Sequence, residues 1–80
     1  MSRTEIESKV NQFLIEDLEI DEENIFPEAH LKNDLGIDSL DYVDIVVIVN
    51  RVFGFKIQNG ELKDVTTLKQ FYDYIESKLA

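Results

Sequence analysis

The sequence contains no cysteine and a single histidine. Without cysteine, the chain can form neither a disulfide bridge nor a zinc site built on thiolates. His30 has no cysteine or second histidine to complete a metal site or a catalytic pair, so we expect it to be a surface or loop residue. The sequence also lacks a glycine-rich phosphate loop, and its acidic residues have no evident base to pair with. These absences argue against an enzyme and against a metal site.

Long apolar runs are missing as well. The longest unbroken aliphatic stretch covers residues 45–49, far fewer than the roughly 20 apolar residues that a membrane-spanning helix needs. Residues 1–10 are polar and charged, unlike the apolar segment of a secretory signal. We therefore expect a cytoplasmic protein that does not insert into membranes.

Positive charge is scarce. Eight lysine and arginine residues face 17 acidic residues, which gives a net charge of −9. This balance argues against nucleic acid as a partner and favours basic protein surfaces, and it disfavours self-association, so we expect a monomer. Seven acidic residues and one lysine lie within residues 19–38, a net charge of −6. The simplest interpretation is a solvated loop, but such a field would also steer basic enzymes towards a neighbouring site.

The length of 80 residues indicates one domain, residues 1–80, with a modest core. Apolar residues at helical spacing, preceded by capping-box patterns, predict a first helix over about residues 4–18 and a last helix that begins at Thr66 or Thr67. Residues 19–38 read as a long loop, Asn59-Gly60 as a tight turn, and residues 61–64 as one helical turn. The loop needs apolar anchors, for which we expect Ile20, Ile25, Phe26, Leu31, Leu35 and Ile37.

Local propensity and context disagree over residues 39–53. The β-branched run from Ile45 to Val49 favours a buried strand when it is read by itself. Ile45, Val49 and Phe53 nevertheless repeat at helical spacing, and Gly54 supplies a helix stop. These signals allow a helix from Ser39 to Phe53 but do not exclude the strand.

The segment Leu35-Gly36-Ile37-Asp38-Ser39-Leu40-Asp41 marks the change from the acidic loop to the apolar run. Gly36 loosens the backbone, either Asp38 or Ser39 can cap a helix, and Asp41 suits its positive end. Taken alone, Ser39 is most simply a cap. A hydroxyl beside unpaired N–H groups at a helix start would also suit an ester linkage to a phosphate.

This motif resembles the phosphopantetheine attachment motif of acyl carrier proteins. The resemblance runs from about Ile6 to Leu79 and includes Phe53-Gly54-Phe55-Lys56-Ile57 and Val65-Thr66-Thr67-Leu68. It decides the choice over residues 39–53 in favour of a helix. It implies an all-α four-helix bundle with a long loop between helices 1 and 2 and a short third helix. It also implies that Ser39 carries a 4′-phosphopantetheine arm, whose thiol the chain itself lacks, and that Asp38 assists the transfer of the arm by a phosphopantetheinyl transferase.

A second apolar row on the same predicted helix consists of Leu40, Val43 and Val47. Its spacing places it away from the Ile45 and Val49 stripe, although burial of Val43 and Val47 is an open alternative. With Asp41 and Asp44 between its members, the row is similar to the surface that carrier proteins offer to basic patches on acyl-transferring, condensing or ligating enzymes.

The resemblance implies a carrier that holds acyl groups as thioesters for fatty acid or specialised acyl-chain biosynthesis. Two departures point to the specialised kind. Asn50, Arg51 and Val52 replace the glutamates common in carriers of fatty acid synthesis, and Ile48 and Phe71 would narrow an acyl cavity if both point inward. We therefore expect a short, branched or aromatic acyl group. An aminoacyl carrier of the D-alanyl type and an unmodified acidic helical interaction module are the alternatives.

Overall fold

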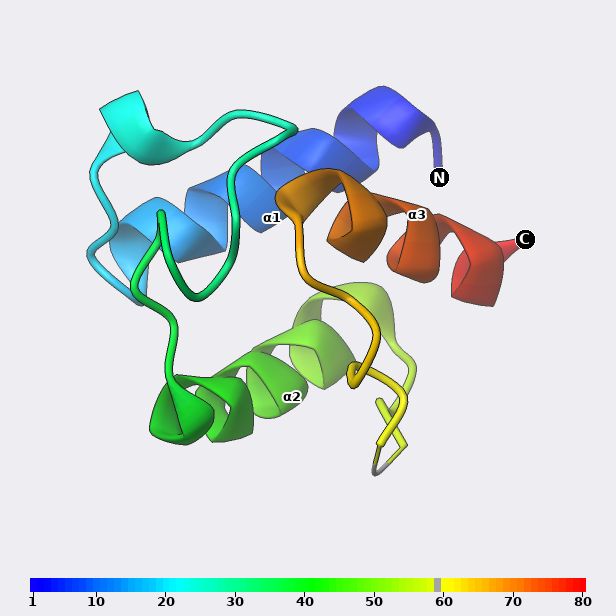
Figure 1. The fold of residues 1–80 in the computed structure, drawn as a ribbon. Helices are drawn as coiled ribbons and strands as arrows, with labels where there is room; N and C mark the ends of the chain where they lie inside the picture. The colour runs from blue at the N-terminus through cyan, green and yellow to red at the C-terminus, as the bar shows by residue number, and fades with distance from the viewer. Residues whose placement is uncertain (59) are drawn as a thin grey trace.

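Three α-helices make up most of this computed structural model, which describes residues 1–58 and 60–80. Helix α1 covers Arg3–Glu16, α2 covers Ser39–Phe53 and α3 covers Leu68–Leu79, and a short 3₁₀ helix, η1, covers Glu22–Asn24. Helix α1 packs against α3, and α2 lies below the pair in the view of Figure 1. The described residues form no strand, so the all-α prediction is confirmed and the strand alternative is wrong.

The helix ends follow capping signals in the sequence. Reciprocal capping boxes begin all three helices, with Ser2 and Glu5 at α1, Asp38 and Asp41 at α2, and Thr67 and Gln70 at α3. Gly54 ends α2 in the left-handed conformation, with φ of 81°. These local signals, together with burial of one face, outweigh the β-propensity of the valine-rich run.

Helix α1 is shorter than the predicted range of residues 4–18. The Leu18 N–H donates to the Phe13 carbonyl at 3.3 Å, and the Ile20 N–H donates to the Leu14 carbonyl at 3.0 Å. Between them, Glu19 has a positive φ of 55°. The chain therefore folds back over the end of the helix, which places Leu18 against the core from outside the helix.

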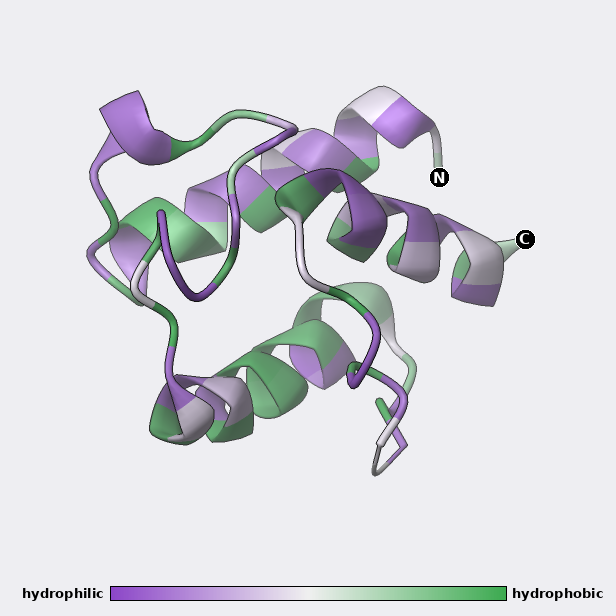
Figure 2. Cartoon of the chain, in the orientation of Figure 1, coloured by the Kyte–Doolittle hydropathy of each residue, from purple (hydrophilic) through white to green (hydrophobic). Residues whose placement is uncertain are grey.

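One hydrophobic core joins the three helices and the loops. Figure 2 shows that hydrophobic residues continue along much of α2, whereas α1 and α3 alternate between hydrophobic and hydrophilic positions. Of the apolar stripes predicted for the first and last helices, all members are buried except Leu18 and Leu79, which are partly buried. Ile45, Val49 and Phe53 of α2 are buried as well. No helix within the described residues is long and apolar enough to cross a membrane.

The long loop is held by the segment that leads into α3. The Leu31 N–H donates to the Thr66 carbonyl at 2.8 Å, and the Leu68 N–H donates to the Ala29 carbonyl at 2.9 Å. Three of the predicted anchors are buried, namely Leu31, Leu35 and Ile37. Two more, Ile20 and Ile25, are partly buried. Phe26 is exposed, so its prediction is wrong, and the small Ala29 is fully buried in its neighbourhood instead.

The short third helix predicted near residues 61–64 is not confirmed. Backbone bonds of the i to i+3 kind, from Lys63 to Gly60 and from Val65 to Leu62, give successive turns. A four-residue segment is too short to build the i to i+4 bonds of an α-helix. The predicted Asn59-Gly60 turn cannot be placed, because Asn59 lies outside the described residues.

Candidate functional site

The loop before α2 is held by its own hydrogen bonds. Nδ1 of His30 accepts from the Asn33 N–H at 3.2 Å, and Oδ2 of Asp34 accepts from the His30 N–H at 2.7 Å. Gly36 has a φ of 70°, a conformation that favours glycine, and the residues on either side of it, Leu35 and Ile37, are both buried. The chain is thus anchored immediately before the start of α2, and His30 is a loop residue as predicted.

Asp38, and not Ser39, is the cap of α2. Oδ1 of Asp38 accepts hydrogen bonds from the N–H groups of Leu40 at 2.9 Å and Asp41 at 3.0 Å. Asp41 returns the contact, since its Oδ2 accepts from the Asp38 N–H at 3.1 Å. Ser39 is the first residue of the helix, is exposed, and has no side-chain hydrogen bond among the described residues. Its hydroxyl is therefore available to solvent and to an enzyme.

The cap changes what the helix start can offer to an anion. The N–H groups of Leu40 and Asp41 are already bonded to Asp38, so they are not the unpaired donors that the sequence interpretation assumed. The carboxylates of Asp38 and Asp41 also offset the positive end of the helix dipole. A phosphate on Ser39 would therefore face solvent, and would not be held in a nest of backbone donors.

Replacing Asp38 with alanine should lower the free energy of unfolding by about 1 kcal/mol, because it removes the side-chain acceptor of an N-cap. Urea unfolding followed by circular dichroism measures this change. Asp44→Ala is the matched control, since it removes the same charge from an exposed position of the same helix. Equal losses in the two variants would mean that charge, and not capping, is responsible.

The second apolar row of α2 faces solvent. Leu40, Val43 and Val47 are 76%, 63% and 61% exposed, whereas Ile45 and Val49 on the opposite side are buried. Asp44 is exposed and Asp41 partly exposed beside the row. The predicted orientation is confirmed and the burial alternative is wrong. Three large exposed aliphatic side chains on one helix face are typical of a contact surface.

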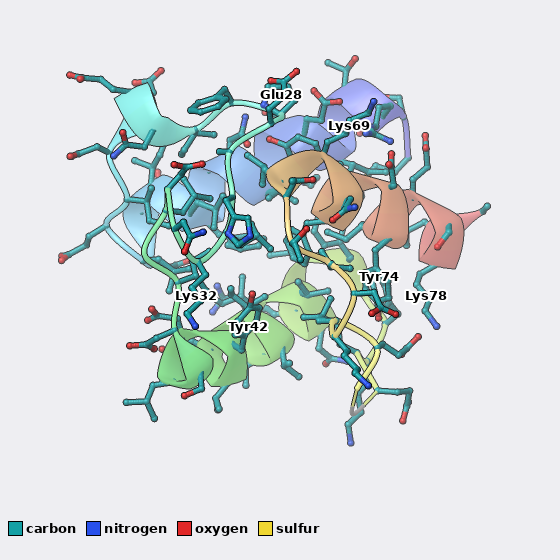
Figure 3. All side chains as sticks on the ribbon, in the orientation of Figure 1. Glu28, Lys32, Tyr42, Lys69, Tyr74 and Lys78 are labelled. Atoms are coloured by element: carbon teal, nitrogen blue, oxygen red, sulfur yellow. The ribbon has the colours of Figure 1, made fainter. Side chains whose placement is uncertain are left out.

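A groove of about 710 Å³ lies beside α2, between this helix and the loop segments on either side of it. Tyr42 and Val46 line it from α2, and since Tyr42 follows Ser39 by three residues, the groove begins one helical turn from the Ser39 hydroxyl. Lys32 comes from the long loop, and Figure 3 shows its side chain extending towards Tyr42. Burial raises the pKa of Tyr42, which keeps its phenol neutral and able to donate.

The groove was not found by sequence reasoning. Its far wall comes from residues 56–58 and from residues within 60–66. The sequence of these segments has no helical or strand periodicity, so only the spacing of Ser39, Tyr42 and Val46 could have indicated the groove. Ile48 and Phe71, in contrast, were expected to narrow an acyl cavity if they pointed inward, and both are buried in the core.

Comparisons with known proteins point in one direction. A family described as "Phosphopantetheine attachment site" matches residues 8–75. The chain is 44% identical over 78 residues to a protein of Thermotoga maritima named "Acyl carrier protein", which covers 98% of this chain and 96% of the relative. It is 39% identical over 79 residues to a protein of the same name from Coprothermobacter proteolyticus, covering 99% and 96%.

Proposed function

Because this chain belongs to the acyl carrier protein family, which consists of carriers and not enzymes, we propose that its 4′-phosphopantetheine is attached to the hydroxyl of Ser39. The observation that supports this choice is the exposed Ser39 hydroxyl, which takes no part in capping the helix that it begins. The attached group supplies a terminal thiol that holds an acyl group as a thioester, and the chain has no cysteine that could do so.

Asp38 is proposed to assist the attachment. Its Oδ1 caps the helix, while its Oδ2 has no hydrogen-bond partner within the described residues. The second oxygen is therefore free to help position a metal ion that neutralises the phosphates of coenzyme A when the transferase acts. Because the cap fixes the carboxylate next to Ser39, one side chain can orient the helix start and serve the reaction there.

The proposal is tested by incubating the purified chain with coenzyme A and a broad-specificity phosphopantetheinyl transferase. Intact mass should rise by one phosphopantetheine group, and digestion should place the addition on the peptide that contains Ser39. No addition would support an unmodified interaction module, and an addition on another residue would overturn the assignment of Ser39. Loading of the modified chain by an amino acid-activating ligase would identify an aminoacyl carrier.

The row of Leu40, Val43 and Val47 is proposed as the surface that docks the transferase and the acyl-handling enzymes. Its aliphatic side chains offer apolar contact, and Asp41 and Asp44 beside them would attract arginine and lysine on the partner. At the other end of α2, Nη2 of Arg51 lies 3.6 Å from Oδ2 of Asp17. This pair brings a positive charge to that end of the helix, so the end is less acidic than the start. Docking would thus be concentrated on the first three turns of the helix.

Val47→Ser should raise the KM of the transferase for this chain about fivefold or more, as expected when an apolar contact of an interface is removed. Val47 follows Ser39 by eight residues, or about 12 Å along the helix, so the hydroxyl itself is not disturbed. Steady-state kinetics measures the effect. Ile15→Ser, an exposed aliphatic position on α1, is the control, and an equal rise in both variants would argue against a specific surface.

The acyl group is proposed to be short, branched or aromatic, in a specialised pathway. Ile48 and Phe71 fill space inside the core, which leaves little room for a long chain between the helices. Mass spectrometry of the protein purified from its own host tests this, since mainly long saturated chains on Ser39 would contradict it.

A further inference from the structure

The groove beside α2 has a charge opposite to that of the chain. Lys32, Lys56, Lys63 and His30 line it, and no acidic residue among the described ones does, although 17 of the 80 residues are acidic. Three of the eight lysine and arginine residues are thus gathered at one hollow. If the charged residues were distributed evenly over the surface, carboxylates would be expected among these lysines.

The three lysines form no ion pair within residues 1–58 and 60–80. Glu61, which lies between Lys56 and Lys63 in the sequence, is engaged elsewhere. Its Oε1 accepts from the Gln58 N–H at 2.7 Å, and its Oε2 pairs with Lys78 of α3 at 2.5 Å. Lys78 lowers the pKa of Glu61, so this acid stays ionised and paired. The positive charge of the groove is left for a ligand.

The rest of the groove is apolar. Its lining includes five aliphatic side chains, contributed by α2 and by the loops on both sides: Leu31, Val46, Ile57, Leu62 and Val65. Tyr42 adds a phenol that can donate a hydrogen bond. An aliphatic surface with cationic groups is complementary to a chain of methylenes that ends in an anion.

We propose that this groove holds an acyl chain that ends in a carboxylate, with its methylenes on the aliphatic lining and its terminal carboxylate at the lysines. The proposal rests on attachment at Ser39, one helical turn from Tyr42, and it names the substrate class for that site. It narrows the short acyl group proposed above to an unbranched one with a terminal carboxylate, and the buried Ile48 and Phe71 do not hinder it, because the chain lies in the surface groove and not between the helices.

The test compares two arms of equal length on the full chain. The transferase loads either an octanoyl group or a suberyl group, the eight-carbon chain with a free terminal carboxylate, from the coenzyme A thioesters. Intact mass is read first, and a failure to load would count against the attachment at Ser39 and not against the groove alone. Both arms contain the same phosphate, so any difference between them belongs to the terminal carboxylate.

Two charge-matched double variants identify the site. Lys56→Gln with Lys63→Gln removes two charges from the groove, while Lys9→Gln with Lys69→Gln removes two charges from positions outside it. Circular dichroism checks that both variants are folded. The readouts are the half-life of the thioester towards hydrolysis and the amide chemical shifts of the groove residues.

In the unsubstituted chain, the suberyl arm should shift the amides of Lys56, Lys63 and Tyr42 more than the octanoyl arm does. Loss of the two groove lysines should shorten the half-life of the suberyl thioester about three- to tenfold, a range that reflects the modest strength of exposed ion pairs. The outer double variant and all octanoyl thioesters should show no such change. Equal half-lives of the suberyl thioester in the two double variants, or an equal loss for octanoyl, would overturn the proposal.

Discussion

Ser39→Ala should abolish the covalent addition of phosphopantetheine, because it removes the oxygen that forms the bond to phosphorus. The fold should survive, with a free energy of unfolding within about 0.5 kcal/mol of the parent chain, as for most surface substitutions. The structural reason is that Asp38 accepts the hydrogen bonds of the helix start, so Ser39 is not needed as a cap. Intact mass after incubation with the transferase and urea unfolding measure the two quantities.

Ser8→Ala is the matched control for this prediction, since Ser8 is an exposed serine within α1. It should be modified as fully as the parent chain. If the alanine variant at position 39 still gained the group, another hydroxyl would be the attachment point. If it lost as much stability as Asp38→Ala, the Ser39 hydroxyl would have a structural role that the hydrogen bonds do not indicate.

The two ends of the helix that begins at Ser39 were predictable because their signals are local, whereas the choice of a helix over a strand needed the resemblance to acyl carrier proteins. Asp38 and Gly54 lie at its two ends, and the spacing of Leu40, Val43 and Val47 against Ile45 and Val49 already separated an exposed row from a core stripe. The choice of cap was not predictable. Asp38 and Ser39 are both good caps, and only the backbone path after Gly36 decides which side chain reaches the free N–H groups.

Features that depend on contacts between distant segments could not be predicted from the sequence. Phe26 was expected to anchor the loop and is exposed, while Ala29 is buried and its carbonyl accepts from the Leu68 N–H of α3. The groove likewise joins Tyr42 of α2 to Lys56 and Lys63, whose segment has no periodicity to read. Such placements follow from tertiary packing, which local propensity and spacing do not encode.

Leu14→Ala should destabilise the chain more than Asp38→Ala or Ser39→Ala does, with a loss of about 2–5 kcal/mol in the free energy of unfolding. Leu14 is 1% exposed and lies on α1, the helix that packs against α3. Its truncation leaves a cavity that the surrounding helices can fill only in part. Small domains have a total stability of about 5–15 kcal/mol, and a chain of this length and charge belongs at the lower end.

The neighbouring residue provides the control, because Ile15 has the same number of carbons on the same helix but is 37% exposed. Ile15→Ala should cost less than about 1 kcal/mol, since less apolar surface returns to water and no internal cavity forms. Urea unfolding of both variants measures the difference. Equal losses would mean that helix propensity at these positions, and not burial against α3, stabilises α1. A chain that loses the α1 and α3 contact would also lose the loop anchored before Asp38, so Leu14→Ala should slow modification of Ser39 at temperatures where the parent chain is still folded.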